Sequence, residues 1–199
     1  MTCKLCDNPA DQDNSHIIPF SLIKTMVTPD ETKRTEKDVT FNLSTPGAVQ
    51  LYFGRELIGE KIHELLGREL TEKEIEQNSN PFTIDGLLCR TCEKKLGRLE
   101  SLYSKIIVPK TTQLYNGADT SVELNETNSL LLKTFIYSII WRLGESNYNG
   151  YSLHESILSK LALILKNCLS LDEDEILSNI ISNKDLINEH KIFTSYFDN

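Results

Sequence analysis

Apolar residues recur at every third or fourth position through most of the C-terminal half of the chain, which is the spacing that places them on one side of an α-helix. Residues 128–143 and 152–169 show this spacing most clearly. Their apolar stripes consist of Leu132, Phe135, Ile136, Ile139, Ile140 and Leu143, and of Leu153, Ile157, Leu161, Ile164, Leu165 and Cys168. A third helix is expected to begin at Ser170, because SLDE at residues 170–173 has the capping-box form and places acidic side chains in a first turn. Its expected apolar residues are Ile176, Leu177, Ile180 and Ile181. The pattern therefore predicts a helical C-terminal half.

The N-terminal half mixes short strand patterns with short helix patterns. Residues 39–43 alternate apolar and polar side chains, as a strand does, and residues 49–53 are expected to pair with them across a turn at residues 45–47. A β-branched run at residues 16–18 predicts another strand, which ends at Pro19.

Short helices are expected between these strands. Helical spacing predicts them at residues 20–26 and 56–66, and TEKE at residues 71–74 has the capping-box form that opens a further one. Residues 28–38 are charged and polar and are expected to form an exposed loop. The stretch of about residues 28–84 is interpreted as an insertion that covers or shapes a site at its ends.

A longer helix is predicted from Cys92 to about Ile107, and it should end before Pro109. Its expected buried stripe consists of Leu96, Leu99, Tyr103 and Ile106. A second face carries Glu93, Gly97, Glu100 and Ser104, because steps of four, three and four residues stay on one side of a helix. The third face is mostly basic and consists of Lys94, Arg98, Ser101 and Lys105.

Four of the five cysteines form two C-x-x-C pairs, here called knuckles, which are Cys3 with Cys6 and Cys89 with Cys92. Two knuckles supply the four thiolates of a closed, tetrahedral structural zinc site. The alternative is two pairs of buried cysteines without a metal. We expect structural zinc, because a small module with little apolar surface gains folding free energy from a bound metal. Cys168 lies on an apolar helix face and is interpreted as a core residue.

The net charge of −8 argues against a free-standing nucleic-acid-binding protein, which is usually basic. The charge is unevenly distributed, however. Residues 89–110 contain six basic and two acidic side chains, whereas residues 171–199 contain seven acidic and two basic ones. An acidic C-terminal region can therefore coexist with a locally basic surface.

The first residues lack the apolar segment of a secretory signal, and no apolar run approaches the roughly 20 residues that a membrane span needs. Paired cysteines fit metal binding in a reducing compartment better than they fit disulfides. We therefore expect a cytoplasmic protein with no membrane partner.

His16 lies between the two knuckles in the sequence. At the end of a strand and beside a zinc-stapled loop, a neutral imidazole can take a proton from water. The alternative is a ring that packs against the zinc loop and is hydrogen-bonded there. His63 is interpreted as a surface or partly buried helix residue. Trp141 and Arg142 are interpreted as a core anchor with an ion pair rather than as a platform for stacking bases.

The order of these motifs resembles that of the HNH, or ββα-metal, endonucleases. A knuckle is followed by SHIIP at residues 15–19 and by LLCRTCE at residues 87–93, where a helix begins. The subgroup with four zinc cysteines, which includes the phage resolvase endonuclease VII, is the most similar. A group of bacterial HNH-like proteins shares the SHIIP and CxxCE motifs, and a C-terminal helix carrying Ile-Trp-Arg recurs in it, as at residues 140–142 here.

The resemblance implies a role for each matched residue. His16 occupies the position of the histidine that activates water, Ser15 that of an acidic residue, and Glu93 that of a polar residue, usually Asn. The last two positions hold Mg²⁺ in the family. Ser15 departs from that pattern, because Mg²⁺ prefers hard oxygens and at least one carboxylate. Glu93, with Glu100 on the same helix face, is expected to supply the missing charge; the alternative is that both are solvated surface carboxylates.

The predicted fold class is α+β, mostly α. Residues 1–110 are expected to form a zinc-stapled, treble-clef-like ββα-metal module, and residues 111–199 a helical C-terminal region. The resemblance implies hydrolysis of phosphodiester bonds in nucleic acid, with DNA as the first candidate, using structural Zn²⁺ and catalytic Mg²⁺ or Mn²⁺. Lys94, Arg98 and Lys105 would then hold the nucleic-acid backbone without reading its sequence.

The acidic chain suggests that activity depends on a protein partner subunit or on a homo-oligomer. The resemblance further implies a place in a bacterial defence system, such as antiphage defence. Two other classes of protein remain open. A zinc-stapled interaction module without chemistry is favoured by Ser15 and by the net charge. A zinc-ribbon adaptor of transcription or translation would leave His16 and Glu93 without a role.

Overall fold

The computed structural model describes residues 1–19, 22, 39–45, 48–53, 63, 67–77, 82–115 and 121–189. Most of these residues are helical, and they are accompanied by two small sheets of two strands each. This content agrees with the predicted α+β, mostly α, class.

Helix α4 (Arg90–Ile106) packs against three other helices, α5 (Val108–Tyr115), α6 (Glu126–Glu145) and α8 (Glu173–Ser182). It ends at Ile107, so that Pro109 falls in the first turn of α5. A proline is tolerated there, because the first N–H groups of a helix have no intrahelical partner. The predicted end of α4 before Pro109 is confirmed, whereas α5 has no counterpart in the sequence prediction.

The faces of α4 follow the predicted stripes with one change. Its buried residues are Cys92, Leu96, Leu99 and Leu102, and Tyr103 and Ile106 are partly buried. Leu102 was not included in the predicted stripe. It is covered because helices pack on two sides of α4, which widens the buried face. Lys94 and Arg98 are exposed, as expected.

The C-terminal half is helical, as predicted. It consists of α6 (Glu126–Glu145), the 3₁₀ turn η2 (Tyr148–Gly150), α7 (Glu155–Cys168), α8 (Glu173–Ser182) and α9 (Lys184–Glu189). Each of the three longer helices is preceded by a residue whose side chain accepts a hydrogen bond from a backbone N–H of the first turn. These residues are Asn125 before α6, His154 before α7 and Asp172 before α8. These caps set where each helix begins.

The capping box predicted at the start of α8 is displaced by two residues. Asp172 is the N-cap, and its carboxylate accepts a hydrogen bond from the Glu175 backbone N–H at 3.0 Å. Ser170, the predicted cap, donates its hydroxyl to Glu175 Oε2 at 2.5 Å instead. Aspartate and serine cap helices equally well, so the local sequence permits the helix to begin after Ser170 or after Asp172. The structure has the later start, and Ile176 and Ile180 are the buried residues of α8.

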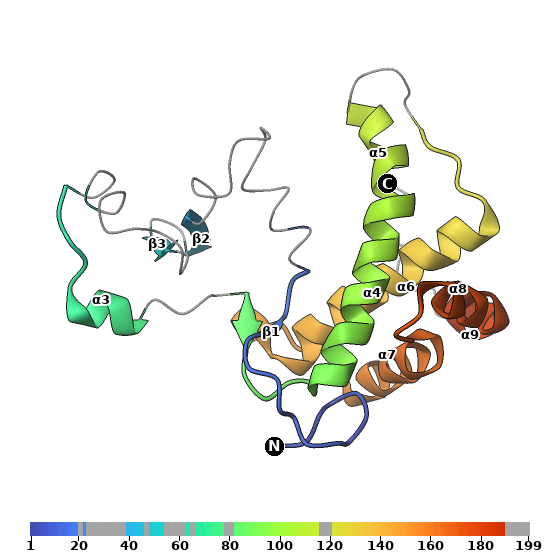
Figure 1. Cartoon of the computed structure of the whole chain (residues 1–199), viewed down its shortest axis with the longest axis horizontal. Coiled ribbons are helices and arrows are strands. Elements are labelled where there is room, and N and C mark those ends of the chain that lie inside the picture. The colour runs from blue at the N-terminus through green and yellow to red at the C-terminus, as the bar shows by residue number, and fades with distance from the viewer. Residues whose placement is uncertain are drawn as a thin grey trace.

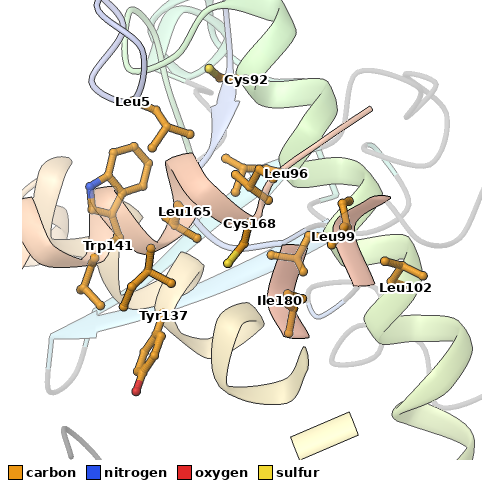
Figure 2. Close-up of a cluster of buried hydrophobic side chains, with 14 of the residues drawn as sticks. Leu5, Cys92, Leu96, Leu99, Leu102, Tyr137, Trp141, Leu165, Cys168 and Ile180 are labelled. Carbon is orange, nitrogen blue, oxygen red and sulfur yellow. The ribbon is translucent and has the colours of Figure 1, made fainter. Parts of the chain in front are cut away.

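One cluster of buried side chains joins the first knuckle to the last helix. Figure 2 shows Leu5, Leu96, Trp141, Leu165 and Ile180 among the side chains of this cluster, which come from both predicted regions of the chain. Trp141 is fully buried, as predicted.

The interpretation of Cys168 as a core residue is confirmed. Its side chain is fully buried within the same cluster, and burial raises the pKa of its thiol to about 12.

Strand β1 (Ser15–His16) pairs antiparallel with β4 (Thr83–Ile84). It starts one residue before the predicted strand and ends at His16, so the expected extension to Ile18 was wrong. Strands β2 (Val39–Thr45) and β3 (Ala48–Phe53) form the predicted hairpin. Helix α3 (Glu72–Gln77) begins directly after Thr71, as its capping-box pattern predicts. Figure 1 shows β2, β3 and α3 to one side of the helical body, whereas β1 lies beside the N-terminal end of α4.

The helices predicted at residues 20–26 and 56–66 and the loop predicted at residues 28–38 lie outside the described residues, apart from Leu22 and His63, which are both helical.

Candidate functional site

The two knuckles lie side by side. The sulfur atoms of Cys3, Cys6, Cys89 and Cys92 all lie within 4.8 Å of one another, and Cys6 Sγ and Cys89 Sγ are 3.6 Å apart. Three of the four residues are buried. Four thiols at this spacing could hold one metal ion, and the all-cysteine set is compatible with structural zinc.

Backbone hydrogen bonds shape each knuckle and join them. In the first knuckle, Cys3 N–H donates to Asn8 O at 2.6 Å, and Asp7 adopts a left-handed φ of 63°, which aspartate tolerates well. The second knuckle follows a turn at Gly86, whose φ of 71° favours glycine. Lys4 N–H donates to Leu87 O at 3.0 Å and thereby holds one knuckle against the other.

The sulfur atoms accept hydrogen bonds that suit metal-bound thiolates. Cys89 is the N-cap of α4, and its Sγ accepts from Cys92 N–H at 3.4 Å, while Cys6 Sγ accepts from Asn8 Nδ2 at 3.3 Å. Burial, followed by the neighbouring thiols of Cys6 and Cys89, raises the pKa of the Cys92 thiol above its ordinary value. Without a cation Cys92 would therefore remain protonated, whereas a bound metal ion favours the thiolate.

His16 and Glu93 meet immediately beside this cluster. His16 is on β1, and Glu93 follows Cys92 in the first turn of α4. Glu93 Oε1 lies 3.4 Å from His16 Nδ1 and 3.3 Å from the His16 backbone nitrogen, so the backbone N–H also donates to this carboxylate. Both distances are at the long end of the hydrogen-bond range. The two side chains are 35% and 20% exposed, so solvent reaches the site.

Two oxygens at this place have no hydrogen-bond partner among the described residues. They are Ser15 Oγ, on a fully buried residue, and Glu93 Oε2, the second oxygen of the carboxylate beside His16. A buried polar atom without a partner costs about 1–3 kcal/mol, and more when it is charged. The unpartnered oxygen of the Glu93 carboxylate, beside His16, is therefore a place where a cation or a bound polar ligand would be stabilised.

Glu100 has a different partner. Its Oε1 accepts a hydrogen bond from Arg142 Nη1 at 2.9 Å, and the Arg142 side chain is only 1% exposed. The interpretation of Trp141 and Arg142 as a core anchor with an ion pair is therefore confirmed. Arg142 Nη1 also donates to the backbone oxygen of His16 at 3.1 Å. Sequence reasoning missed this contact with the site, and the available signal was an arginine at a buried position of an otherwise apolar helix.

Two of the three basic residues expected to hold a nucleic-acid backbone face an acidic residue of α8. Lys105 Nζ lies 2.7 Å from Glu173 Oε2, and Arg98 Nη1 lies 4.0 Å from Glu173 Oε1. Lys94 is exposed in the first turn of α4. These ion pairs are solvent-exposed and therefore weak, so a phosphate group could compete for the same cations.

A surface groove of about 580 Å³ lies elsewhere, between the first knuckle and α7. It is lined by Lys4, Glu145, Glu155, Leu158, Ser159, Ala162, Leu163 and Lys166. None of the predicted site residues lines it. His63 is exposed, in agreement with its interpretation as a surface residue.

Comparison of the chain with protein-family models, with curated proteins and with solved structures gives no match. Among the helices of the described residues, none has both the length and the apolar character that crossing a membrane requires.

Proposed function

We propose that this chain is a divalent-metal-dependent endonuclease of the HNH type, with zinc held by the four cysteines as a structural ion. The order of elements supports this proposal. Strands β1 and β4 pair and are followed directly by α4, and a knuckle precedes β1 while the other opens α4. This order of elements supports the proposed ββα-metal arrangement, with an insertion between the two strands.

The observation that carries the proposal is the carboxylate of Glu93, which has one oxygen beside the His16 ring and the other buried without a partner among the described residues. The first contact would orient the imidazole and select the tautomer that carries a proton on Nδ1. Nε2 would then accept a proton from a water molecule that attacks the phosphodiester.

A divalent ion fits the second oxygen. Glu93 Oε2 and Ser15 Oγ are hard donors of the kind that Mg²⁺ and Mn²⁺ prefer. Such an ion, when bound, would neutralise charge on the phosphate and on the leaving oxygen. Glu100 is left out of the proposed ligand set, because it already serves as the counter-ion of a buried arginine.

The test is cleavage of plasmid DNA, single-stranded DNA and RNA by the purified protein in the presence of Mg²⁺ or Mn²⁺. His16→Ala is expected to lower the rate by about 10²- to 10⁴-fold, the usual loss on removing a general base. Zinc content and melting temperature should stay at parent values. His63→Ala is the matched control, because His63 is an exposed histidine to which the proposed mechanism assigns no role. A His16→Ala variant that cuts as fast as the parent would rule out this mechanism.

Glu93→Gln separates the metal from the base. The amide keeps the shape of the side chain but weakens the binding of a cation. Its activity should therefore fall at low Mn²⁺ and recover in part at high Mn²⁺, whereas the activity of His16→Ala should not recover.

A second candidate, a zinc-stapled interaction module without catalysis, is favoured by two ion pairs of one acidic residue. Glu173 neutralises Lys105 and lies at 4.0 Å from Arg98, which lowers the positive charge of the expected nucleic-acid face. This candidate predicts zinc-containing protein that cuts none of the three substrates at any divalent-ion concentration.

A further inference from the structure

We propose that Arg142 is a positioning residue, which fixes His16 against Glu93 and so makes α6 a working part of the site. The expected effect of Arg142 on catalysis rests on the proposed function. Its effect on the orientation of the His16 ring does not, and that effect can be measured without any nuclease activity.

The guanidinium of Arg142 joins three elements at one point. Nη1 donates both to the His16 backbone oxygen, at 3.1 Å on β1, and to Glu100 Oε1, at 2.9 Å on α4. Nε and Nη2 donate to the backbone oxygen and hydroxyl of Ser138, on the same helix as Arg142, at 3.2 and 3.4 Å. A planar group with its donors in a fixed fork can satisfy all these acceptors together, which a lysine cannot do.

The position of His16 needs such a support. β1 has only two residues, and its pairing with β4 is equally short. Two different elements thus carry the two halves of the dyad, β1 the histidine and α4 the glutamate, and both hydrogen bonds from His16 to Glu93 are long, at 3.3 and 3.4 Å. Arg142 binds the backbone of the first and the side chain of Glu100 on the second, so it fixes one element relative to the other.

The burial of the Arg142 guanidinium also favours a role in positioning His16. The side chain of Arg142 is 1% exposed, and a buried ion pair stabilises a fold no better than well-packed apolar side chains do. An apolar residue would serve packing as well. An apolar residue could not, however, donate a hydrogen bond to the backbone oxygen of His16.

The test compares two variants with a control. Arg142→Lys keeps the positive charge but cannot bind His16 O, Glu100 and Ser138 at once. The double variant Arg142→Met/Glu100→Met removes both charges together and leaves no buried charge unpaired. Tyr137→Phe is the control: it removes a buried hydrogen bond from α6 to Ile187 O at 3.1 Å, away from the site.

The first readout is the pair of ring ¹⁵N chemical shifts of His16, assigned by comparison with His16→Ala. In the parent protein and in Tyr137→Phe, His16 should show one dominant tautomer with the proton on Nδ1. In both Arg142 variants the two shifts should move towards each other, as in a solvent-exposed imidazole that exchanges between its two tautomers. The second readout is nuclease activity, which should fall by about 10- to 100-fold, the usual loss when a group that orients an active residue is removed.

The outcomes separate the two proposals. An inactive parent whose His16 tautomer still depends on Arg142 would reject the proposed function and keep this inference. Parent-like ring shifts and activity in either Arg142 variant would overturn the inference. So would failure of both variants to fold, because Arg142 would then be a structural group.

Discussion

At the scale of single residues, the chemistry of this chain is concentrated in groups that sequence patterns identify only in part. The spacing of the cysteines predicts their cluster, because two C-x-x-C pairs in one chain are typical of a four-cysteine metal site. The meeting of His16 with Glu93 was expected from the resemblance. The link from Glu100 to Arg142 was not, because an ion pair between residues 42 apart leaves no local periodic signal.

The proposed role of Ser15 as a ligand of the divalent ion can be tested by a single substitution. Its hydroxyl is buried and lacks a partner among the described residues, so Ser15→Ala should raise the free energy of unfolding by about 1 kcal/mol in metal-free buffer. The same change should reduce the stabilisation that added Mn²⁺ produces, because a ligand that binds only the folded protein stabilises it according to its affinity. Urea denaturation with and without Mn²⁺ measures both effects.

Ser170→Ala is the matched control for Ser15. This buried serine donates its hydroxyl to Glu175, so its replacement should lower stability and leave the Mn²⁺ response unchanged. If Ser15→Ala lowers stability by as much as Ser170→Ala and responds normally to Mn²⁺, Ser15 is not a metal ligand.

At the scale of elements, apolar periodicity predicts which segments are helical, but it does not fix where they begin. The helices of the C-terminal half were predicted from stripes that do become buried, including those around Trp141 and Leu165. The start of α8 was misplaced because Ser170 and Asp172 are both good caps. Helix α5 was missed because a proline near its start suggested an end, when it can equally occupy a first turn.

The register of α8 can be measured directly. Asp172→Ala should lower the free energy of unfolding by about 1 kcal/mol, because it removes the acceptor of the Glu175 backbone N–H. Asp174→Ala removes the same charge from the same helix turn without removing a cap, so it should cost less than about 0.5 kcal/mol. Asp172→Asn should retain most of the stability, since asparagine is also a good cap. Equal losses from the two alanine variants would show that charge alone, and not the cap, is responsible.

At the scale of the whole molecule, the four-cysteine site and the C-terminal helices share one core. The cluster that contains Cys3, Cys89 and Cys92 also contains Trp141 and Ile187. Residues far apart in the sequence therefore depend on one another for burial, a property that no local pattern could have predicted. The sequence supported a boundary near residue 110, but buried residues on both sides of it pack in the same cluster.

If the four cysteines hold zinc, its removal should therefore destabilise the whole core and not the knuckles alone. Structural zinc contributes about 10 kcal/mol or more to the folding of small zinc-binding peptides, which is comparable with the whole stability of a typical domain. Chelation should lower the melting temperature and shift the fluorescence of Trp141, the single tryptophan, towards longer wavelength. Both signals should change together if the core unfolds as one unit.

Two cysteine variants provide the control for chelation. Cys89→Ser removes a predicted ligand and should abolish the response to the chelator along with the bound zinc. Cys168→Ser places a hydroxyl in the core and should also lower stability, but its zinc content and chelator response should match the parent. Identical behaviour of the two variants would argue against the zinc site.

The distance along the chain between the parts of the site also sets when the site can exist during protein synthesis. Cys6 precedes Cys89 by 83 residues, and His16 precedes Arg142 by 126. At roughly 5–20 residues per second, a ribosome would need about 6–25 s to add Arg142 after His16. During that interval a nascent chain carries the histidine but not the arginine that holds it in place. If the protein cleaves nucleic acid, it would reach full activity only after α6 has left the ribosome, which is itself built largely of RNA.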